Sequence, residues 1–585
     1  MDSLSTQVWD IKYRYRYQGR IIDHTIADTW QRVAKAIARA EKTALARRTW
    51  EKSFYEVLSE LHFLPGGRIL AGAGTQHHVT LFNCFVMQLA GDSLDAIFNA
   101  LKEGALTLQQ GGGIGYDFSV LRPRGSTVRR AGTLASGPVS FMRIWDTMSE
   151  TLLATGLRRG AMMGVLRCDH PDIEEFITAK SIAKELRHFN ISVMVSDAFM
   201  QAVQTDSDWP LVFPLRADEV PSGDIVYKTW SNQTMPVPCR IVRHIRARAL
   251  WQQIIQQAYD HAEPGVLFEE TINRLNNLYY CEHLSATNPC GEIPLPVYGA
   301  CNLGSINLPQ FVIHAFSPQA QLNWAALENT TAIATRFLDD VIDISHYPLK
   351  VQKQQALATR RIGLGITGLA DALVMLGVRY GSAESLQLSG QIMRRIAEVT
   401  WHTSVELAKE KGVFPTLQPA YLRGEFIQKF SSELQEAVAK HGIRNSHHNT
   451  IAPAGSISLL AGNVSNGLEP IFQPHYKRHM HMANGELCTV QVTDYALQQW
   501  RQYAQAQSLP PAWVDVNTLM PEEHLQMQAA VQPYIDNAIS KTINIPQAFP
   551  FSGLADIYSK AYALGLKGCT VFRPNPITGS VLVRL

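Results

Sequence analysis

The spacing of apolar residues first predicts a helical region at the N-terminus. Between residues 26 and 62 apolar side chains recur at helical spacing, and helix breakers are scarce until Pro65. The recurring positions are Trp30, Val33, Ala34, Ile37, Ala38 and Leu45. This period places them on one face of a helix, where they can pack against the rest of the protein. We therefore expect an N-terminal helical region over residues 1–63.

From residue 64 onward the pattern changes to that of an α/β protein. Up to about residue 137, glycine-rich turns such as GGRILAGAGT and QQGGGIGYD separate short apolar runs, as expected of loops around a site. Helical periods predict helices over 138–155, 171–185, 245–280, 325–345, 350–376, 382–412 and 550–568. The segment NPCGEIPLPVYGACNLGSINL and the later CTVFRP have the pattern of strands and tight loops. With no repeat or linker visible, we expect one large α/β catalytic unit over residues 64–585.

Composition narrows the possible classes of protein. The chain of 585 residues is 46% hydrophobic and 18% charged, and its 53 basic and 51 acidic residues give a net charge of +2. These values are typical of a folded globular protein, and they give no reason to expect a nucleic-acid polymer or a membrane as partner. No signal peptide and no run of about 18 apolar residues is present, so we expect a cytoplasmic protein. The 8 cysteines are too few for a disulfide scaffold and are expected to be thiols.

One group of cysteines has neighbours suited to catalysis. Asn288, Cys290 and Glu292 stand at alternate positions, so in an extended loop an amide, a thiol and a carboxylate would share one face. Cys301 follows eleven residues later, and Cys84 lies upstream in the apolar run LFNCFVM. A buried cysteine is by itself most often an inert small hydrophobe. It is the combination of residues that favours a functional site.

Two other kinds of site are disfavoured. A zinc site would need closely spaced ligands, but the chain has no Cys-x2-Cys pair, and the histidines at 77, 78, 170, 479 and 481 follow no ligand pattern. We expect no metal site. The segment from Gly363 to Gly368 matches GxGxxG, yet the residues before it, QKQQALATRR, are polar rather than strand-like, which argues against a nicotinamide oxidoreductase. We interpret it as a helix whose glycines allow close packing.

Several separated motifs resemble one known family. NPCGEIPL with a second cysteine eleven residues on, LFNC followed by AGDSLDAI, and APAGSISLLAGNVSNGLEPIF resemble the large subunit of ribonucleotide reductases, over about residues 64–574. GGRILAGAGT, RRGAMMGVLRCDHPDIEEF, RRIGLGITGLADAL and CTVFRP are most similar to the adenosylcobalamin-dependent (class II) branch. The resemblance implies a ten-stranded α/β barrel of two five-stranded halves, with Cys290 on a central finger loop and an N-terminal helical layer.

The resemblance also implies roles for the catalytic residues. Cys290 matches the thiyl radical that removes the 3′-hydrogen of a ribonucleotide. Glu292 matches the general base for the 3′-hydroxyl, and Asn288 matches the amide that orients it. Cys84 and Cys301 match the dithiol that becomes a disulfide as the 2′-hydroxyl leaves as water. A thioredoxin-type or other thiol reductant would then restore the pair.

The resemblance further implies binding sites for nucleotides. The substrate site would comprise Asn83, Gly112, Pro453, Ala454, Gly455, Ser456 and Ile457. Taken alone, the segment around Ser456 is more typical of a plain serine helix cap than of a phosphate site, and it is the resemblance that favours the phosphate site. A specificity effector, a dNTP or ATP, would bind at Asp92, Ser93, Leu94, Arg129, Arg130 and Arg159. Because such a site is shared between neighbouring subunits, the resemblance favours a homodimer.

The source of the radical is a separate question. Reductases that receive it from a metal-containing subunit carry adjacent tyrosines near the C-terminus, but the matching stretch from Cys569 to Arg573 has none. We therefore expect adenosylcobalamin as cofactor. The alternatives are a large subunit that depends on a separate metal subunit, and an inactive nucleotide-binding regulator. We also expect neither an N-terminal ATP cone nor a C-terminal cysteine pair, since the last cysteine is Cys569.

Overall fold

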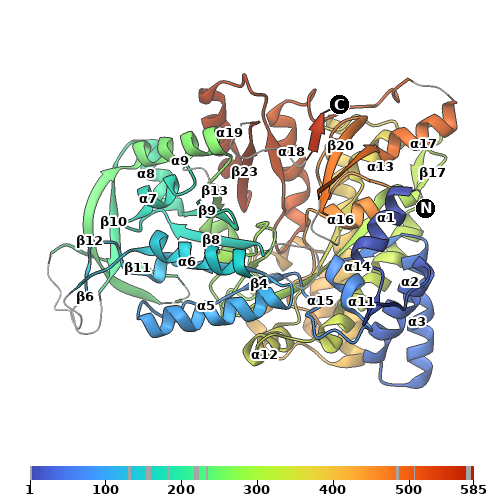
Figure 1. Ribbon diagram of the computed structural model, residues 1–585, viewed down its shortest axis with the longest axis horizontal. Coiled ribbons are helices and arrows are strands. Elements are labelled where there is room, and N and C mark those ends of the chain that lie inside the picture. The colour runs from blue at the N-terminus through green and yellow to red at the C-terminus, as the bar shows by residue number, and fades with distance from the viewer. Residues whose placement is uncertain are drawn as a thin grey trace.

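The computed structural model describes residues 3–128, 133–152, 160–181, 185–215, 223–231, 233, 235–481, 487–505, 508–574 and 582–584. Its N-terminal helices lie at one end of the molecule, and a small antiparallel sheet lies at the other end (Figure 1). That sheet consists of β10 (Asp208–Pro214), β11 (Ile225–Thr229) and β12 (Pro236–Arg246). Between the two ends lies the largest sheet of the described residues, which has ten strands.

Five strands of the large sheet form a parallel half. In spatial order they are β4 (Cys84–Val86), β5 (Gly113–Asp117), β8 (Met162–Arg167), β9 (Phe189–Val195) and β13 (Gly265–Phe268), and each pairs in parallel with the next. Nearly every residue of these strands is buried. Burial on both faces is typical of parallel strands, and it explains why their sequences show apolar runs without alternation.

The second half meets the first at two antiparallel seams. β16 (Ala300–Asn307) pairs with β4, and β23 (Gly568–Phe572) pairs with β13. Within this half, β16 is parallel to β19 (Ile362–Thr367), and β23 is parallel to β22 (Thr542–Asn544). Parallel bridges link Leu364 to Asn449 and Ile451 to Ile539. These pairings continue the barrel from β19 toward β22. β3 (Phe63–Pro65) adds to β16. The expected barrel of two halves is thus confirmed.

The predicted N-terminal helical region consists of three helices, which pack against the barrel. They are α1 (Ser3–Lys12), α2 (Ile26–Ile37) and α3 (Ala44–Ser59). Thr25 and Thr43 cap α2 and α3, so their side chains define the starts of these helices. Helix α3 packs on α11 (Trp324–Ile344), and the ring centroids of Phe54 and Phe337 lie 5.0 Å apart.

Two expected helices are wrong because each contains a buried barrel strand. Residues 350–376 divide into α12 (Lys350–Thr359), β19 and α13 (Leu369–Met375), so the GxGxxG segment is a strand. Its glycines do permit close packing, because a Cβ at Gly365 would lie 2.0 Å from the Thr450 carbonyl oxygen. Residues 245–280 likewise contain α9 (Ala247–His261), β13 and α10 (Glu269–Arg274). A short apolar strand cannot be distinguished from a buried helix by periodicity alone.

The remaining helices agree with the pattern in position, with some differences in length. They include α6 (Pro138–Thr151), α11, α14 (Ala383–Lys411) and α19 (Phe551–Ala563), whereas α7 (Ile173–Thr178) is shorter than expected. Among the helices of the described ranges, none is long and apolar enough to cross a membrane.

Candidate active site

A short hairpin inside the barrel carries Cys290 at its tip. Its strands are β14 (Ala286–Thr287) and β15 (Pro294–Leu295), and all four of these residues are buried. The hairpin passes so close to β5 that a Cβ at Gly115 would lie 1.8 Å from the Thr287 carbonyl oxygen. Only glycine fits at this approach, so β5 fixes the path of the loop through the barrel.

The loop between the two strands is a tight turn rather than the extended segment expected. The Asn288 carbonyl accepts a hydrogen bond from the Gly291 N–H at 3.1 Å, and Gly291 has a φ of +80°. The Asn288 side-chain oxygen accepts a second bond from the Ile293 N–H at 2.9 Å. The expected grouping therefore arises from a turn that brings Asn288 and Glu292 together, not from alternation along a strand.

Asn288 and Glu292 both reach the sulfur of Cys84. The Asn288 amide donates to Cys84 Sγ at 3.2 Å, and Cys84 Sγ lies 3.8 Å from Glu292 Oε1. Cys84 and Cys301 are directly opposite each other in the register of the antiparallel β4 and β16 strands. Opposed residues on such strands have Cα separations that a disulfide can span. Both thiols are buried, and burial raises the pKa of Cys301 well above its usual range.

Hydrogen bonds from two sides hold the main chain of the loop between β14 and β15, residues 288–293, which is the candidate catalytic loop. The Glu292 carbonyl accepts from the Ala538 N–H at 2.9 Å and from the Thr450 hydroxyl at 2.8 Å. The Asn190 side-chain amide donates to the Pro289 carbonyl at 2.7 Å. These contacts come from both halves of the barrel, and they leave the loop little freedom to shift.

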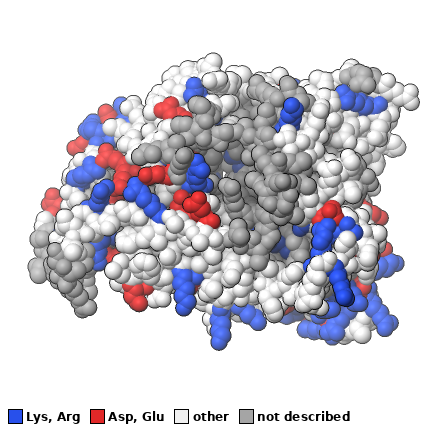
Figure 2. All heavy atoms as spheres, in the orientation of Figure 1, with Lys and Arg blue, Asp and Glu red and all other residues white. Residues whose placement is uncertain are grey.

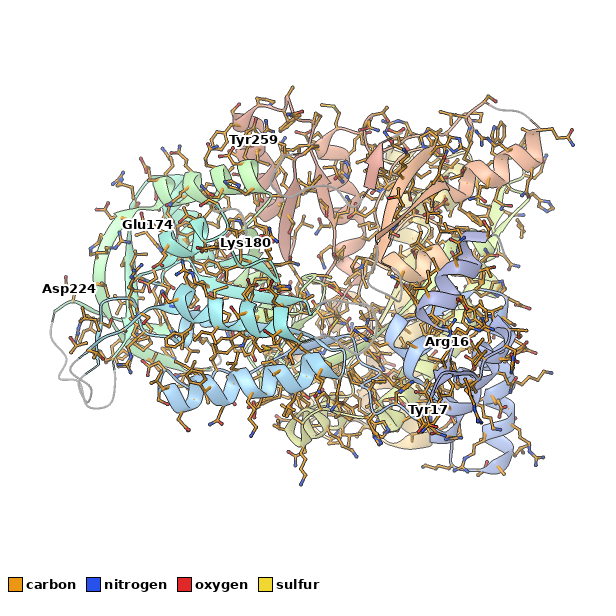
Figure 3. All side chains as sticks on the ribbon, viewed as in Figure 1. Arg16, Tyr17, Glu174, Lys180, Asp224 and Tyr259 are labelled. Atoms are coloured by element: carbon orange, nitrogen blue, oxygen red, sulfur yellow. The ribbon has the colours of Figure 1, made fainter. Side chains whose placement is uncertain are left out.

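Cys290 itself is half-buried and lines a cavity of about 710 Å³. The other residues that line this cavity include the starts of β9 and β13, residues 538–542 and β23. Lys180, labelled in Figure 3, contributes to its rim and forms an ion pair with Glu263. Across the described ranges, no group of three or more His, Cys, Asp or Glu side chains is placed to hold a metal ion.

The segment expected to bind the substrate phosphate lies beside this cavity. Pro453 lines the cavity, Ala454 adopts a φ of +47°, and α16 (Gly455–Leu460) begins directly afterwards. Residues 452–456 are half-buried, whereas the Ile457 side chain belongs to the core. One contact could not be expected from the sequence: Tyr13 of the N-terminal region donates a hydrogen bond to Ser456 Oγ at 2.8 Å.

Two further expected substrate residues lie at the start of the first half-barrel. The side-chain oxygen of Asn83 is buried, and no hydrogen-bond partner for it exists among the described residues. A Cβ at Gly112 would lie 2.6 Å from the Phe85 ring, so this glycine accommodates that ring. A further role of Gly112 beside a nucleotide stays a prediction.

The expected effector residues lie at the start of α5 (Leu94–Gln109). Ser93 caps this helix by accepting from the Ala96 N–H at 3.2 Å, and Asp92 accepts from Arg122 Nε at 2.5 Å. Leu94 is 64% exposed. The remaining expected effector residues, Arg129, Arg130 and Arg159, lie outside the described residues.

Comparison with known proteins agrees with this fold and identifies the family. The family model "Ribonucleotide reductase, barrel domain" matches residues 82–572, and "Ribonucleotide reductase, all-alpha domain" matches residues 1–78. Together these matches cover most of the chain, so the protein belongs to the ribonucleotide reductase large-subunit family.

Several relatives refine this assignment. The chain is 36% identical to a vitamin B12-dependent ribonucleoside-diphosphate reductase of Mycobacterium tuberculosis, over 97% of this chain and 78% of the relative. It is 38% identical to a protein of the same description from Thermoplasma acidophilum, over 90% of this chain and 66% of the relative. It is 27% identical to a ribonucleoside-diphosphate reductase subunit alpha of Chlamydia pneumoniae, over 79% of this chain and 47% of the relative.

Proposed function

We propose that this protein reduces ribonucleoside diphosphates to 2′-deoxyribonucleoside diphosphates with adenosylcobalamin as cofactor, and so supplies precursors for DNA. The observation that carries the proposal is the convergence of Asn288 and Glu292 on Cys84, which stands opposite Cys301, while Cys290 on the same loop opens onto the cavity. The diphosphate is chosen because the relatives with 36% and 38% identity are described as diphosphate reductases.

In the proposed reaction the residues of the site act one after another. The Cys290 thiyl radical removes the 3′-hydrogen atom of the ribose, and Glu292 accepts the proton of the 3′-hydroxyl. One thiol hydrogen of the pair Cys84 and Cys301 leaves with the 2′-hydroxyl as water and the other forms the new C2′–H bond, while the two sulfurs supply two electrons and join in a disulfide. Cys290 then returns a hydrogen atom to C3′, and Glu292 returns the proton to the 3′-oxygen. Asn288 holds the loop and Cys84 in place throughout.

The cavity beside Cys290 fits a role in cofactor binding. Its volume of about 710 Å³ would hold the part of the cofactor next to Cys290 rather than the whole molecule, because pockets of roughly 300–1,000 Å³ enclose smaller, drug-sized ligands. Bound adenosylcobalamin supplies, by homolysis of its cobalt–carbon bond, the radical that oxidises the Cys290 thiol. Residues of β23, among them Cys569, Thr570, Val571 and Phe572, line the same cavity and would help to hold the cofactor. The buried surroundings would shield the radical from water.

A radical from a separate metal-containing subunit is the alternative. In such enzymes adjacent tyrosines carry the radical to the thiol, but β23 places Val571 and Phe572 along this cavity. The strand β23 therefore carries no adjacent tyrosines that could take part in such a relay. This favours the cobalamin-dependent reaction.

Reduction of CDP with and without adenosylcobalamin tests the proposal directly. We expect deoxycytidine diphosphate to form only when the cofactor is present, and we expect Cys290→Ser to form none. Activity that is indifferent to adenosylcobalamin and requires a second, metal-containing subunit would overturn the cofactor assignment. Turnover by the folded Cys290→Ser protein would overturn the assignment of the radical.

We also propose that the protein is a homodimer regulated by a dNTP or ATP. α5 exposes Leu94, Phe98 and Leu106, and Ile144 is exposed on the neighbouring α6. An apolar surface on two adjacent helices suits contact with a second copy of the chain. Asp92 and Ser93 lie at the start of α5, so an effector bound there would lie close to that contact.

The disulfide must be reduced after each turnover. The seven cysteines whose side chains the structure describes are free thiols, which suits work in a reducing compartment such as the cytoplasm. We propose a thioredoxin-type protein or a small thiol as reductant. Multiple-turnover assays with thioredoxin and with dithiothreitol separate the two, since turnover with dithiothreitol alone would exclude an obligatory protein reductant.

A further inference from the structure

A tyrosine of the N-terminal region reaches the segment that is expected to bind the substrate phosphate. Tyr13 directly follows α1, and its hydroxyl donates a hydrogen bond to Ser456 Oγ at 2.8 Å. The two residues are 443 positions apart in the sequence, and Tyr13 is only 3% exposed. The bond is therefore made by the fold and is not a chance contact between two surface side chains.

Hydrogen bonds hold the main chain of Tyr13 on both sides of its side chain. Its N–H donates to the Trp9 carbonyl at 2.9 Å, and its carbonyl accepts from Arg32 Nη2 at 3.3 Å. Arg32 in turn forms a buried ion pair with Asp23 at 2.9 Å. Because Tyr13 is already ordered, its hydroxyl can hold Ser456 in place at little cost in entropy when a ligand binds.

The two hydroxyl groups lie against a pair of glycines that also contacts Asn83. A Cβ at Gly67 would lie 3.2 Å from the Tyr13 hydroxyl oxygen and 3.6 Å from Ser456 Oγ. A Cβ at the preceding Gly66 would lie 2.9 Å from Asn83 Oδ1. Two of the expected substrate residues, Asn83 and Ser456, are therefore brought together at one short segment.

Asn83 connects this segment to the catalytic loop. A Cβ at Gly113 would lie 3.3 Å from the Asn83 carbonyl oxygen and 3.1 Å from Pro289 Cγ. Pro289 directly precedes Cys290. A series of short contacts thus leads from Cys290 to Ser456, so a nucleotide that spans these residues would have its ribose at one end and its phosphates at the other.

The direction of the hydrogen bond leaves the hydrogen of Ser456 available. A hydroxyl group has one hydrogen to donate and two lone pairs that accept. Tyr13 donates to Ser456 Oγ, and among the residues that the structure describes Ser456 Oγ has no second hydrogen-bond partner. A hydroxyl that accepts such a bond is polarised and becomes a stronger donor itself. The Ser456 hydroxyl is therefore prepared to donate to an oxygen atom of a ligand.

A positive charge lies beside the same segment. A Cβ at Gly455 would lie 3.7 Å from Arg478 Nη2. Arg478 belongs to β20 (His475–His481) and is half-buried. A guanidinium group at this distance favours an anionic ligand such as a phosphate group over a neutral one.

We propose that Tyr13 is a positioning residue for the substrate phosphates: it holds Ser456 Oγ so that the serine hydroxyl donates to a phosphate oxygen of the ribonucleoside diphosphate. The inference rests on the proposed function, in which the ribose of that substrate lies at Cys290. It gives the N-terminal helical region a part in substrate binding. Neither residue touches the reacting atoms, so the loss of either hydroxyl should weaken binding and leave the chemical step unchanged.

Equilibrium binding of CDP without adenosylcobalamin measures this contribution separately from turnover. For Ser456→Ala we expect about ten- to hundred-fold weaker binding, the usual effect of losing a hydrogen bond to a charged group. For Tyr13→Phe, which removes only the hydroxyl, we expect about three- to tenfold weaker binding, the usual effect of a neutral hydrogen bond. In CDP reduction by Tyr13→Phe, KM should rise by the same factor while kcat stays that of the wild type.

A matched control removes another hydroxyl from the same region. Tyr17, labelled in Figure 3, lies on β1 (Arg16–Tyr17). Tyr17→Phe should bind CDP as the wild type does. Weakening in Tyr17→Phe equal to that in Tyr13→Phe would show that any change in this region disturbs the site, and it would contradict the inference.

Two comparisons distinguish positioning from a structural effect. In the Ser456→Ala background, Tyr13→Phe should weaken CDP binding no further, because Tyr13 acts through Ser456. Pyrophosphate should compete with CDP less well in both single variants than in the wild type. Cytidine, which has no phosphate, should compete equally well in all of them.

The outcomes separate the inference from the proposed function. If folded Tyr13→Phe binds CDP and pyrophosphate with wild-type affinity, the inference is overturned while the proposed function stands. An equal loss for cytidine and CDP would also overturn it, since the effect would then not concern the phosphates. If the wild type does not bind CDP at all, the proposed function fails, and the inference falls with it.

Discussion

Glu292 illustrates how a single residue acquires a role from its surroundings. Its side chain is 1% exposed, its carboxylate lies near Cys84, and its carbonyl is held by Thr450 and Ala538. A base positioned this rigidly needs little reorganisation during proton transfer. The contribution of the residue should therefore lie in the rate of the chemical step rather than in substrate binding.

Glu292→Gln tests this role with little change in shape. We expect kcat for CDP reduction to fall by about 10²- to 10⁴-fold, the usual contribution of a general base, with a small change in KM. Single-turnover kinetics with prereduced enzyme would measure it. The exposed Glu433→Gln should behave as the wild type. A kcat within a factor of three of the wild type would show that another group accepts the proton.

A buried carboxylate pair far from the site should control how stability depends on pH. Asp371 accepts from the Ser465 and Ala496 N–H groups, and Asp494 caps α17 (Tyr495–Ala504). Burial raises the pKa of Asp371 to about 6, and burial with the nearby Asp371 charge raises the pKa of Asp494 well above its usual range. The folded state then binds protons more tightly than the unfolded state, so these groups lower stability as pH rises from about 4 toward 7.

Asp494→Asn should remove much of this loss, because an amide can still cap the helix. We expect the free energy of unfolding of the variant, relative to wild type, to rise by about 1–3 kcal/mol between pH 4.5 and pH 7.5. Urea unfolding at the two pH values measures the difference. If the free energy of unfolding of the variant differed from that of the wild type by the same amount at pH 4.5 and pH 7.5, the raised pKa values of Asp371 and Asp494 would be contradicted.

At the scale of elements, the position of the catalytic hairpin depends on glycines in the strands around it. Gly115 of β5 lies against Thr287 of β14, and Gly365 of β19 lies against Thr450. Thr450 in turn holds Glu292. The first half-barrel thus contacts the catalytic hairpin directly at Gly115, and the second contacts it through Thr450, which lies against Gly365. Neither position has room for a side chain.

Gly115→Ala should displace the hairpin, because its Cβ would lie 1.8 Å from a backbone oxygen that cannot rotate away. We expect about 1–3 kcal/mol lower stability, the usual cost of overpacking, and a loss of CDP reduction larger than that destabilisation explains. Gly91→Ala, with no atom within 4 Å of its Cβ, is the control for folding. Full activity in Gly115→Ala would mean that the hairpin can shift without consequence.

At the scale of the whole molecule, the cluster of basic side chains and the exposed apolar side chains lie on different parts of the protein. In Figure 2 basic side chains gather over the N-terminal helices, while both charges mix across the opposite end. Figure 1 shows α5 along an outer edge of the molecule, away from the N-terminal helices. The proposed contact between two copies therefore lies on the half of the barrel that carries the expected effector residues.

Phe98→Asp should weaken this contact, because Phe98 is 49% exposed and a carboxylate there would be buried on association. We expect light scattering to show monomers at concentrations where the wild type is dimeric. CDP reduction should persist but no longer respond to added dNTP. The Tyr227→Asp control alters an exposed aromatic residue on β11, outside α5 and α6. Unchanged dimers in Phe98→Asp would place the interface elsewhere.

The sequence by itself determined the α/β class, the long helices α11 and α14 and the residues of the catalytic loop, because these depend on local periodicity and on motifs. Only the tertiary structure decided that the GxGxxG segment is a barrel strand, that a turn brings Asn288 to Glu292, and that Tyr13 reaches Ser456. Buried strands lack alternation, and contacts between distant residues depend on how the barrel closes, which no local pattern encodes.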